Sequence, residues 1–570
     1  MEKLRTIINS YQNKELKYLD NKYNFENIFA IPLIINQLFQ FMDKSDIKCL
    51  SICSKKIYQL YCNQIKNLKI NEEIKSSKLL NIILDKYKNI LKLDLSKCKN
   101  IDDYSLISNL EKLESLNLSN IKISDISFLK NNKNIKELDL KGCKTIKDYS
   151  LISNFEKLEK LNLSNTNIAD FSFLEKNKNI KELDLKGCDN IKDYSFISRL
   201  EKLETLNLNN SKISDISFLK RNKNIKELDL SGCKSIIYYS ILSNLEKLEK
   251  LSLVWTNIAN ISFLQKNENI KELNLKICKN IKDFSFISKL GKLENLNLSN
   301  TQISDFSFLE QNENLLKLDL SECKHIDDYS LISNLEKLEN LNLSKTDITD
   351  LTFLEKNKNI KELDLSGCKN INDYSFILNL EILENLNLSW TNISYISFTQ
   401  KNESIKELNL KGCDNIKDYS FISNLEKLEN LNLSYTKISD ISFLEKNKNI
   451  KKLYLSGCKT IKDYSLISNL EKIEVLNLSD TYISDISFLG KNKNIKDLNL
   501  KCCIKINDYS FISNLEKLEN LNLSNTKISD FSFLKYNRNI NELNLKGYNN
   551  IIDYSFIYNL LKNKNIQIYK

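Results

Sequence analysis

The sequence predicts an α/β solenoid, with parallel β-strands on a concave face, short helices or irregular segments on a convex face, and a small N-terminal helical domain. Three observations predict it. Ten cysteines recur every 45 residues, each interval contains two related halves, and residues 1–65 share neither pattern. A fixed period of this length indicates supersecondary units that stack on one another. We therefore expect a helical domain over 1–65, a linker or N-terminal cap over 66–89, and the solenoid over 90–570.

The repeating unit is 22 or 23 residues long, which places about 21 units after residue 90. The cysteines that mark the double period are Cys98, Cys143, Cys188, Cys233, Cys278, Cys323, Cys368, Cys413, Cys458 and Cys503. In the second half of each interval the equivalent position is usually threonine, as at Thr166. A spacing of 45 residues puts successive cysteines two coils apart, about 10 Å, which is too far for one metal ion. We therefore interpret them as buried structural thiols.

The spacing inside one unit predicts a strand, a turn and a short helix. Leu138 and Leu140 are two residues apart, so both side chains lie on one face of a strand and Asp139 lies on the other. Cys143 follows where the chain must leave the strand. Asp148 then precedes a short apolar segment and is suited to be the N-cap of a helical turn.

This pattern resembles the leucine-rich repeat superfamily over about 480 residues, from residue 90 onward. The half in which Cys143 is followed by Ile146 and Asp148 is similar to its cysteine-containing class. The resemblance implies a leucine-rich repeat solenoid whose core is made of stacked leucine, isoleucine and phenylalanine side chains. One departure is that the usual asparagine of the family is replaced throughout by cysteine or threonine.

Residues 31–58 predict a helical hairpin. Its apolar residues have helical spacing in two runs, Ile35, Leu38, Phe39 and Met42, then Ile47, Leu50, Cys53 and Ile57. The segment between Asp43 and Asp46 separates the runs and supplies an N-cap for the second helix. Pro32, the single proline of the chain, opens the first.

The same segment resembles the F-box. The matching residues are Ile31-Pro32, Leu38-Phe39, Met42-Asp43, Asp46-Ile47, Leu50-Ser51 and Ile57-Tyr58. The resemblance implies docking on a Skp-family adaptor of a cullin-type ubiquitin ligase, with adaptor-facing or hairpin-core contacts from Pro32, Leu38, Phe39, Met42, Ile47 and Leu50. The acidic residue usually found two positions after the proline is absent, and the proline-to-phenylalanine spacing is one residue short. The alternative is a helical cap that shields the open end of the solenoid.

The composition argues against most other classes of function. The single histidine, His325, excludes two-histidine zinc sites and makes a histidine-based catalytic triad improbable, and only nine glycines exclude recurring phosphate loops. The net charge is +10, but lysine alternates with glutamate along the repeats, which argues against nucleic-acid binding. No apolar run is long enough to span a membrane. We expect no cofactor, no metal and no enzymatic activity.

Candidate partner-binding residues are those that break the repeat. In the column just before the turn asparagine is the commonest residue of the second halves, but both tryptophans of the chain, Trp255 and Trp390, and also Tyr435 lie there. Glycines on adjacent strands should leave open space on both sides of Trp390 and Tyr435. Tyr454 replaces the Asp or Asn of a nearby strand face. Large aromatic residues of this kind anchor protein interfaces; the alternative is neutral drift on a solvated rim.

These observations predict a non-enzymatic protein-interaction subunit. The favoured interpretation is an F-box substrate receptor, which binds a protein substrate on its solenoid and presents it for ubiquitination. The alternative is a leucine-rich repeat scaffold with no link to a ubiquitin ligase. The N-terminal residues lack the apolar core of a secretory signal, so we expect a reducing compartment, the cytoplasm or the nucleus, or the host-cell cytoplasm for a viral protein.

Overall fold

The computed structural model describes residues 66–70, 77–96, 98, 101–528, 530–547 and 567–569, and the chain divides into two units, Met1–Ser211 and Lys212–Lys570. The expected helical domain over 1–65 lies outside the described residues. Both units are built from coils of one kind, in which a three-residue strand is followed by a turn and a short helix. Nearly all of these helices are 3-10 helices, labelled η.

Unit 1 contains seven described strands. They are β1 (Asn67–Lys69), β2 (Lys92–Asp94), β3 (Ser115–Asn117), β4 (Glu137–Asp139), β5 (Lys160–Asn162), β6 (Glu182–Asp184) and β7 (Thr205–Asn207). Its described helices are α6 (Ser77–Lys86), η1 (Ser105–Asn109), η2 (Ser127–Leu129), η3 (Ser150–Asn154), η4 (Ser172–Lys176) and η5 (Ser195–Arg199). The first strand, which pairs with β2, and α6 lie in the segment that the sequence assigns to a linker or cap.

Unit 2 contains sixteen described strands. They are β8 (Glu227–Asp229), β9 (Lys250–Ser252), β10 (Glu272–Asn274), β11 (Asn295–Asn297), β12 (Lys317–Asp319), β13 (Asn340–Asn342), β14 (Glu362–Asp364), β15 (Asn385–Asn387), β16 (Glu407–Asn409), β17 (Asn430–Asn432), β18 (Lys452–Tyr454), β19 (Val475–Asn477), β20 (Asp497–Asn499), β21 (Asn520–Asn522), β22 (Glu542–Asn544) and β23 (Gln567–Tyr569).

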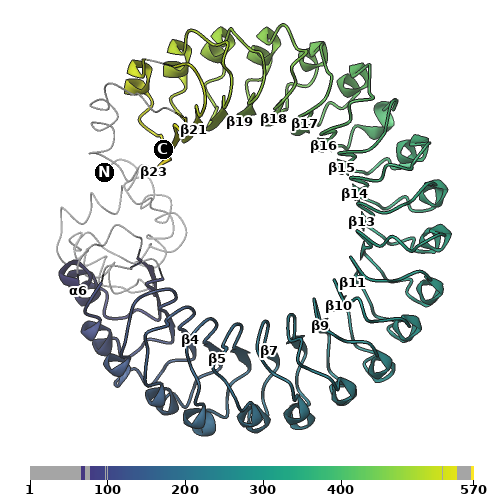
Figure 1. Ribbon diagram of the computed structural model, residues 1–570. Helices are drawn as coiled ribbons and strands as arrows, with labels where there is room; N and C mark the ends of the chain where they lie inside the picture. The colour runs from purple at the N-terminus through teal and green to yellow at the C-terminus, as the bar shows by residue number, and fades with distance from the viewer. Residues whose placement is uncertain are drawn as a thin grey trace, which may run out of the picture. The chain divides into compact units, whose positions relative to one another are not determined.

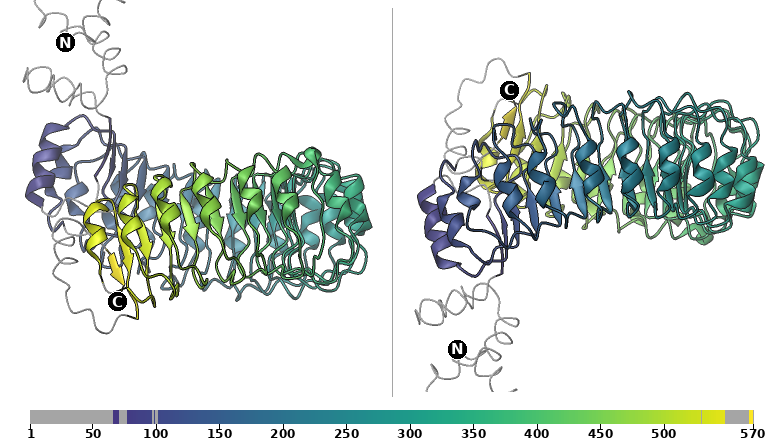
Figure 2. Two further views of the ribbon diagram at one scale, coloured as in Figure 1. Left: turned by 90° about the horizontal axis from the view of Figure 1, so that it is seen from above. Right: turned by 90° about the horizontal axis from the view of Figure 1, so that it is seen from below.

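The described 3-10 helices of unit 2 are η6 (Ser217–Arg221), η7 (Ser240–Asn244), η8 (Ser262–Lys266), η9 (Ser285–Lys289), η10 (Ser307–Gln311), η11 (Ser330–Asn334), η12 (Thr352–Glu355), η13 (Ser375–Asn379), η14 (Gln400–Asn402), η15 (Ser420–Asn424), η16 (Ser442–Glu445), η17 (Ser465–Asn469), η18 (Ser487–Lys491), η19 (Ser510–Asn514) and η20 (Ser532–Tyr536). Within unit 2 the strands line one side of the coils and these helices line the other (Figure 1). Figure 2 shows the successive coils of the unit stacked side by side.

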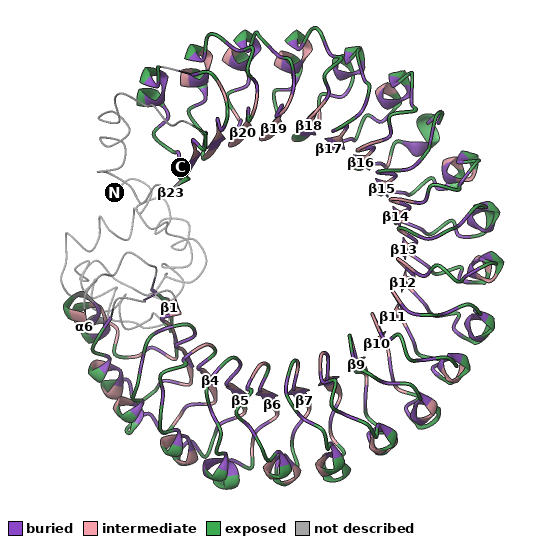
Figure 3. Cartoon of the chain, in the orientation of Figure 1, coloured by how far each residue is buried: buried purple, intermediate pink, exposed green. Residues whose placement is uncertain are grey.

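Parallel pairing in constant register builds the core. In unit 1 Leu116 pairs with Leu138, and Leu138 pairs with Leu161, so leucines stack on leucines from coil to coil. Leu138 and Leu140 are buried and Asp139 between them is not, which confirms the predicted alternation. The helices bury the side that faces the strands and expose the other (Figure 3). Each coil therefore buries its apolar face only against its neighbours.

An aspartate precedes most of the short helices, and in η3 it lies one position before the N-cap instead of being the N-cap itself. Asp148 Oδ1 accepts a 2.8 Å hydrogen bond from the Ser150 backbone N–H, but the N-cap residue of η3 is Tyr149. The helix is a 3-10 helix because the coil leaves room for only five helical residues before the next strand begins. Ile152 is fully buried, as the sequence predicts.

Where the second half has threonine, the threonine and the cysteine of the next coil donate to one carbonyl oxygen. The Thr166 hydroxyl donates to the Leu163 carbonyl oxygen at 2.7 Å, and the Cys188 thiol of the next coil donates to the same oxygen at 3.0 Å. A carbonyl oxygen has two lone pairs, so both donors are accommodated. This pairing explains how cysteine and threonine can stand where the family usually has asparagine.

Buried asparagines form a second line of bonds between coils, which the sequence analysis did not predict. In unit 1 the amide of Asn177, fully buried, donates to the carbonyl oxygens of Ile152 at 3.1 Å and Phe155 at 3.0 Å. Both acceptors lie at the C-terminal end of η3 in the preceding coil. The side chain therefore adds a second hydrogen bond to two carbonyl oxygens that each already accept one backbone N–H.

The buried thiols are expected to resist alkylation in the folded protein. Burial raises the pKa of Cys143 and of Cys503 to about 11, so the reactive thiolate is scarce at about pH 8. We expect peptide mapping by mass spectrometry to find the ten periodic cysteines modified by iodoacetamide only after denaturation. Cys502, which is half-buried, serves as the internal control. Equal modification of the periodic cysteines with and without denaturant would show that they are not structural thiols.

Candidate functional site

A left-handed turn residue follows the described strands of unit 2 at one edge of the sheet, with φ between 55° and 91°. These residues are Gly232, Trp255, Ile277, Asn300, Glu322, Lys345, Gly367, Trp390, Gly412, Tyr435, Gly457, Asp480, Cys502, Asn525 and Gly547. Glycine and asparagine tolerate this conformation, whereas a bulky L-residue pays about 1–2 kcal/mol for it. All the strands are parallel, so the turn residues share the edge formed by their carboxyl ends.

Three of the four predicted binding residues occupy strained positions in this turn. Trp255, Trp390 and Tyr435 have φ values of 57°, 61° and 58°. Their side chains are 53%, 50% and 47% exposed, so burial in the core does not explain why aromatic residues are there. A positive φ in a bulky residue is kept only when the surrounding structure enforces it, and such backbone strain is concentrated at functional sites.

The aromatic rings pack on glycines of the following coil. A Cβ atom added to Gly412 would lie 2.3 Å from Cε3 of Trp390, and one added to Gly457 would lie 2.7 Å from Cδ1 of Tyr435. The two rings stack with centroids 6.3 Å apart and planes at 26°. The expectation of open space on both sides is therefore wrong, because each ring itself fills the space above the glycine that follows it.

A lysine lies between the two rings. The Lys411 ammonium is 5.8 Å from the Trp390 ring centroid and 5.5 Å from that of Tyr435. Lys411 lies two residues after β16, the strand between those that precede the two rings, and its side chain is half-buried. At these distances the cation is attracted to both π faces. The three side chains therefore form a single aromatic and cationic surface.

Tyr454, the third residue of β18, lies near this surface and departs from its own column. In the register of the sheet it lies between Asn432 and Asn477. Those asparagines accept a backbone N–H two residues later, as in the 3.0 Å bond from the Ser434 N–H to Asn432 Oδ1, and a tyrosine cannot replace that bond. Burial raises the pKa of its half-buried hydroxyl. Tyr454 thus places an apolar ring on an otherwise amide-lined face.

Trp255 follows β9 and lies apart from the other three predicted residues, six strands before Trp390. The Lys234 ammonium is 3.0 Å from its ring centroid. Its coil keeps the usual helix start, since Asn260 Oδ1 accepts the Ser262 N–H at 2.8 Å. The coil of Trp390 does not, because Tyr395 replaces the aspartate and the helix begins later, with Thr399 as its N-cap.

Two exposed residues at the same edge escaped the sequence analysis. Tyr482 is 49% exposed, with Lys505 and Lys459 ammonium groups 4.4 Å and 5.8 Å from its ring centroid. Ile504 is 45% exposed and follows β20. The equivalents of Tyr482 in the other second halves of unit 2 are Lys212, Asn257, Gln302, Asp347, Asn392, Lys437 and Lys527. The search for breaks in a column would have found Tyr482 if it had been extended two residues past the turn.

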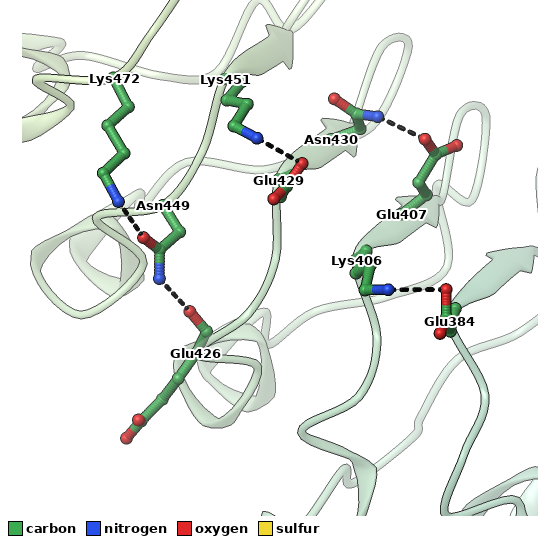
Figure 4. A network of polar contacts seen from close by, with 9 residues as sticks. All are labelled: Glu384, Lys406, Glu407, Glu426, Glu429, Asn430, Asn449, Lys451 and Lys472. Atoms are coloured by element: carbon green, nitrogen blue, oxygen red, sulfur yellow. Dashed lines mark hydrogen bonds and ion pairs between the residues drawn. The ribbon is translucent and has the colours of Figure 1, made fainter. Parts of the chain in front are cut away.

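At the amino ends of the strands, opposite this edge, lysines pair with glutamates of the preceding coil (Figure 4). Lys406 contacts Glu384 and Lys451 contacts Glu429, both at 2.8 Å. Asn430 donates to Glu407 at 2.5 Å. Exposed pairs of this type contribute at most about 1 kcal/mol each. The lysines and glutamates in these pairs already neutralise each other, so they are less available to a partner.

The described residues contain no cluster of three side chains able to hold a metal ion, and no helix among them is long and apolar enough to cross a membrane. The remaining predicted site residues lie outside the part of the chain that the structure describes. These are the adaptor-binding residues Pro32, Leu38, Phe39, Met42, Ile47 and Leu50.

The repeats match known protein families. A family model described as Leucine Rich repeats (2 copies) matches residues 156–199, 178–221 and 426–472, and one described as BspA type Leucine rich repeat region (6 copies) matches 246–372. No curated protein matches the chain at a significant level.

Solved structures with the same kind of fold include a leucine-rich repeat protein of Leptospira interrogans. It is 22% identical, with a TM-score of 0.50 over 74% of this chain and 99% of its own. An internalin of Listeria monocytogenes is also 22% identical, covers 69% of this chain and 88% of its own, and has a TM-score of 0.30. The first likeness shows the fold. The family models show leucine-rich repeats over residues 156–221, 246–372 and 426–472, and the coil geometry described above agrees with them.

Proposed function

We propose that the chain is a non-enzymatic substrate receptor, which binds a protein partner with its repeats and docks through residues 1–65 on a Skp-family adaptor of a cullin ubiquitin ligase. The observation that carries the binding half is the exposed aromatic surface of Trp390, Lys411 and Tyr435, maintained at a cost in backbone strain. The docking half is supported by the F-box resemblance of residues 31–58. The repeats would belong to the cysteine-containing class.

Such a receptor needs no catalytic group of its own. It raises the effective concentration of substrate lysines near a ubiquitin-charged enzyme, and this concentration depends on both binding sites being occupied at once. Trp255, Trp390, Tyr435 and Tyr454 are proposed to bind the substrate. The cytoplasm or nucleus, where cullin ligases work and thiols stay reduced, is the proposed location.

Adaptor capture tests the docking half. The full chain is expected to retain a purified Skp-family adaptor, whereas a Leu38→Ala/Phe39→Ala variant should lose at least about 90% of it, because buried apolar anchors dominate such interfaces. A Trp255→Asn variant is the matched control and should retain the adaptor, since it changes only the repeats. The amounts bound are measured by affinity capture followed by gel densitometry.

Failure of the soluble full chain to retain any adaptor would contradict the ubiquitin-ligase link. The chain would then be a binding scaffold whose first 65 residues cap the repeats. The cap alternative makes a different prediction for the truncated protein. Removal of residues 1–65 would expose the apolar end of the stack, and the protein should aggregate in size-exclusion chromatography.

A further inference from the structure

We infer that the partner segment held by unit 2 is an extended, acidic stretch of polypeptide that runs along the carboxyl ends of β15 to β20. This surface, the carboxyl edge, consists of residues 389–392, 411–415, 434–437, 456–460, 479–482 and 501–505. The inference rests on the proposed protein-binding function and deepens it by naming the chemistry of the partner. Apolar side chains of the segment contact the aromatic residues, and its carboxylates contact lysines.

Apolar residues recur along the carboxyl edge. Trp390, Tyr435, Tyr482 and Ile504 are each between 45% and 50% exposed. Trp390 and Tyr435 form one continuous surface through their stacked rings, and Tyr482 follows two strands further on, about 10 Å away. An extended chain advances about 10 Å in three residues, so one strand-like segment can reach both. Exposed aromatic residues in such a row are typical anchors of protein interfaces.

The lysines of the carboxyl edge favour a negatively charged partner. The carboxyl edge contains five lysines and two aspartates. One of these aspartates, Asp414, already pairs with Lys437 at 3.3 Å. Lys411, Lys459 and Lys505 instead contact aromatic rings, and among the described residues no carboxylate lies within ion-pair distance of them.

These three cations contrast with Lys406 and Lys451 at the amino ends of the strands, which are paired with glutamates of the neighbouring coil. Carboxylates placed over the edge would gain a partner without breaking an existing ion pair, and the nearby rings exclude water from the contact. Acidic side chains interleaved with apolar ones therefore complement both features of the edge. Asp414 and Asp480 lie within the same surface and disfavour a continuous polyphosphate backbone, so we favour protein over single-stranded nucleic acid.

Peptide selection on the immobilised full chain tests the inference. The probe is a displayed library of random peptides of about a dozen residues. We expect the recovered sequences to be enriched in aspartate and glutamate alternating with apolar residues. A selected peptide should bind a Trp390→Asn/Tyr435→Asn variant about 30-fold more weakly, as expected for loss of hot-spot residues. Asparagine is the commonest residue at this position in the second halves of the repeat, so the variant is expected to fold.

A charge variant and a matched control make the test specific. Lys411→Gln/Lys459→Gln/Lys505→Gln should recover apolar peptides without acidic enrichment. Tyr536→Asn is the control, because Tyr536 is exposed and lies 5.9 Å from the Lys535 ammonium but belongs to η20, away from the edge. It should bind the selected peptides as the wild type does.

Recovery of no peptides, of peptides without acidic enrichment, or of the same acidic peptides by the lysine variant would overturn the inference. Binding of a labelled oligothymidine or oligouridine that competes with the peptides and is lost in the aromatic variant would overturn it in favour of nucleic acid. Because adaptor capture does not involve unit 2, it can succeed when this test fails. The two failures are therefore distinguishable.

Discussion

Replacing Asn357 by aspartate is expected to lower the free energy of unfolding by about 4 kcal/mol, the largest effect of any single substitution considered. Asn357 is fully buried in unit 2, and its amide donates to the carbonyl oxygens of Ile332 at 2.9 Å and Leu335 at 3.0 Å. In an Asn357→Asp variant a carboxylate of the same shape faces two carbonyl oxygens. Both hydrogen bonds are lost, and an unpaired charge is buried against two negative dipoles.

The sign of the pH dependence follows from the same geometry. The buried site favours the neutral carboxyl, so the substituted side chain takes up its proton more readily in the folded than in the unfolded protein. The deficit is therefore smallest below about pH 4, where both states are protonated, and it increases as the pH rises above that value. Urea unfolding followed by circular dichroism at several pH values measures it.

Asn359 provides the matched control for this substitution. It lies two residues later and donates to the Glu336 carbonyl oxygen of the preceding coil at 2.7 Å, but it is exposed. Asn359→Asp should cost less than about 1 kcal/mol, because water replaces the lost bond. Equal costs for the two substitutions would show that the buried asparagines do not hold the coils together.

Replacing Gly412 by alanine is expected to lower the free energy of unfolding by about 2 kcal/mol. The residue has φ +72°, where a side chain costs about 1 kcal/mol. The new Cβ would also overlap the Trp390 ring, which must rotate into solvent and lose its stacking on Tyr435, worth about 1 kcal/mol. With Trp255 replaced by phenylalanine, the fluorescence of Trp390 should shift to longer wavelength in the Gly412→Ala variant.

A mutant cycle separates the two contributions. In a Trp390→Ala background the overlap with the indole is gone, so Gly412→Ala should cost only about 1 kcal/mol in urea unfolding. Gly291→Ala is the control, because nothing lies within 4 Å of its added Cβ. Other coils carry glutamate at the equivalent position, as at Glu246 and Glu336, so this change should be neutral or slightly stabilising. An equal cost of Gly412→Ala in both backgrounds would contradict the packing of Trp390 on this glycine.

The coil was predictable because its determinants are local and repeated. The alternation of Leu138, Asp139 and Leu140 and the constant spacing fix the strands and their register. The role of Asn177 was missed because an asparagine flanked by lysines in the sequence is usually solvent-exposed. Only the fold shows that its side chain is buried against the carbonyl oxygens of Ile152 and Phe155. The exact start of η3 was displaced by one residue because the coil is too tight for an α-helical turn.

The candidate site was predictable in part. The positions of Trp390 and Tyr435 were found as breaks in a column, and their exposure agrees with that interpretation. The left-handed backbone and the overlap with Gly412 were not foreseen, because they depend on how one coil lies on the next. Lys411 was overlooked for the same reason, because only the fold brings this lysine close to both rings. The predicted adaptor contacts around Pro32 remain predictions.

The most direct test of the central claim, that the stacked aromatic residues of the carboxyl edge hold the partner, is the affinity of a selected acidic peptide for the Gly412→Ala and Gly291→Ala proteins. Neither substitution changes an aromatic residue or a lysine of the carboxyl edge. The account predicts that Gly412→Ala weakens binding at least about 10-fold, because it moves the Trp390 ring, and that Gly291→Ala leaves binding unchanged. Wild-type affinity in the Gly412→Ala protein, with the Trp390 emission shifted, would contradict it.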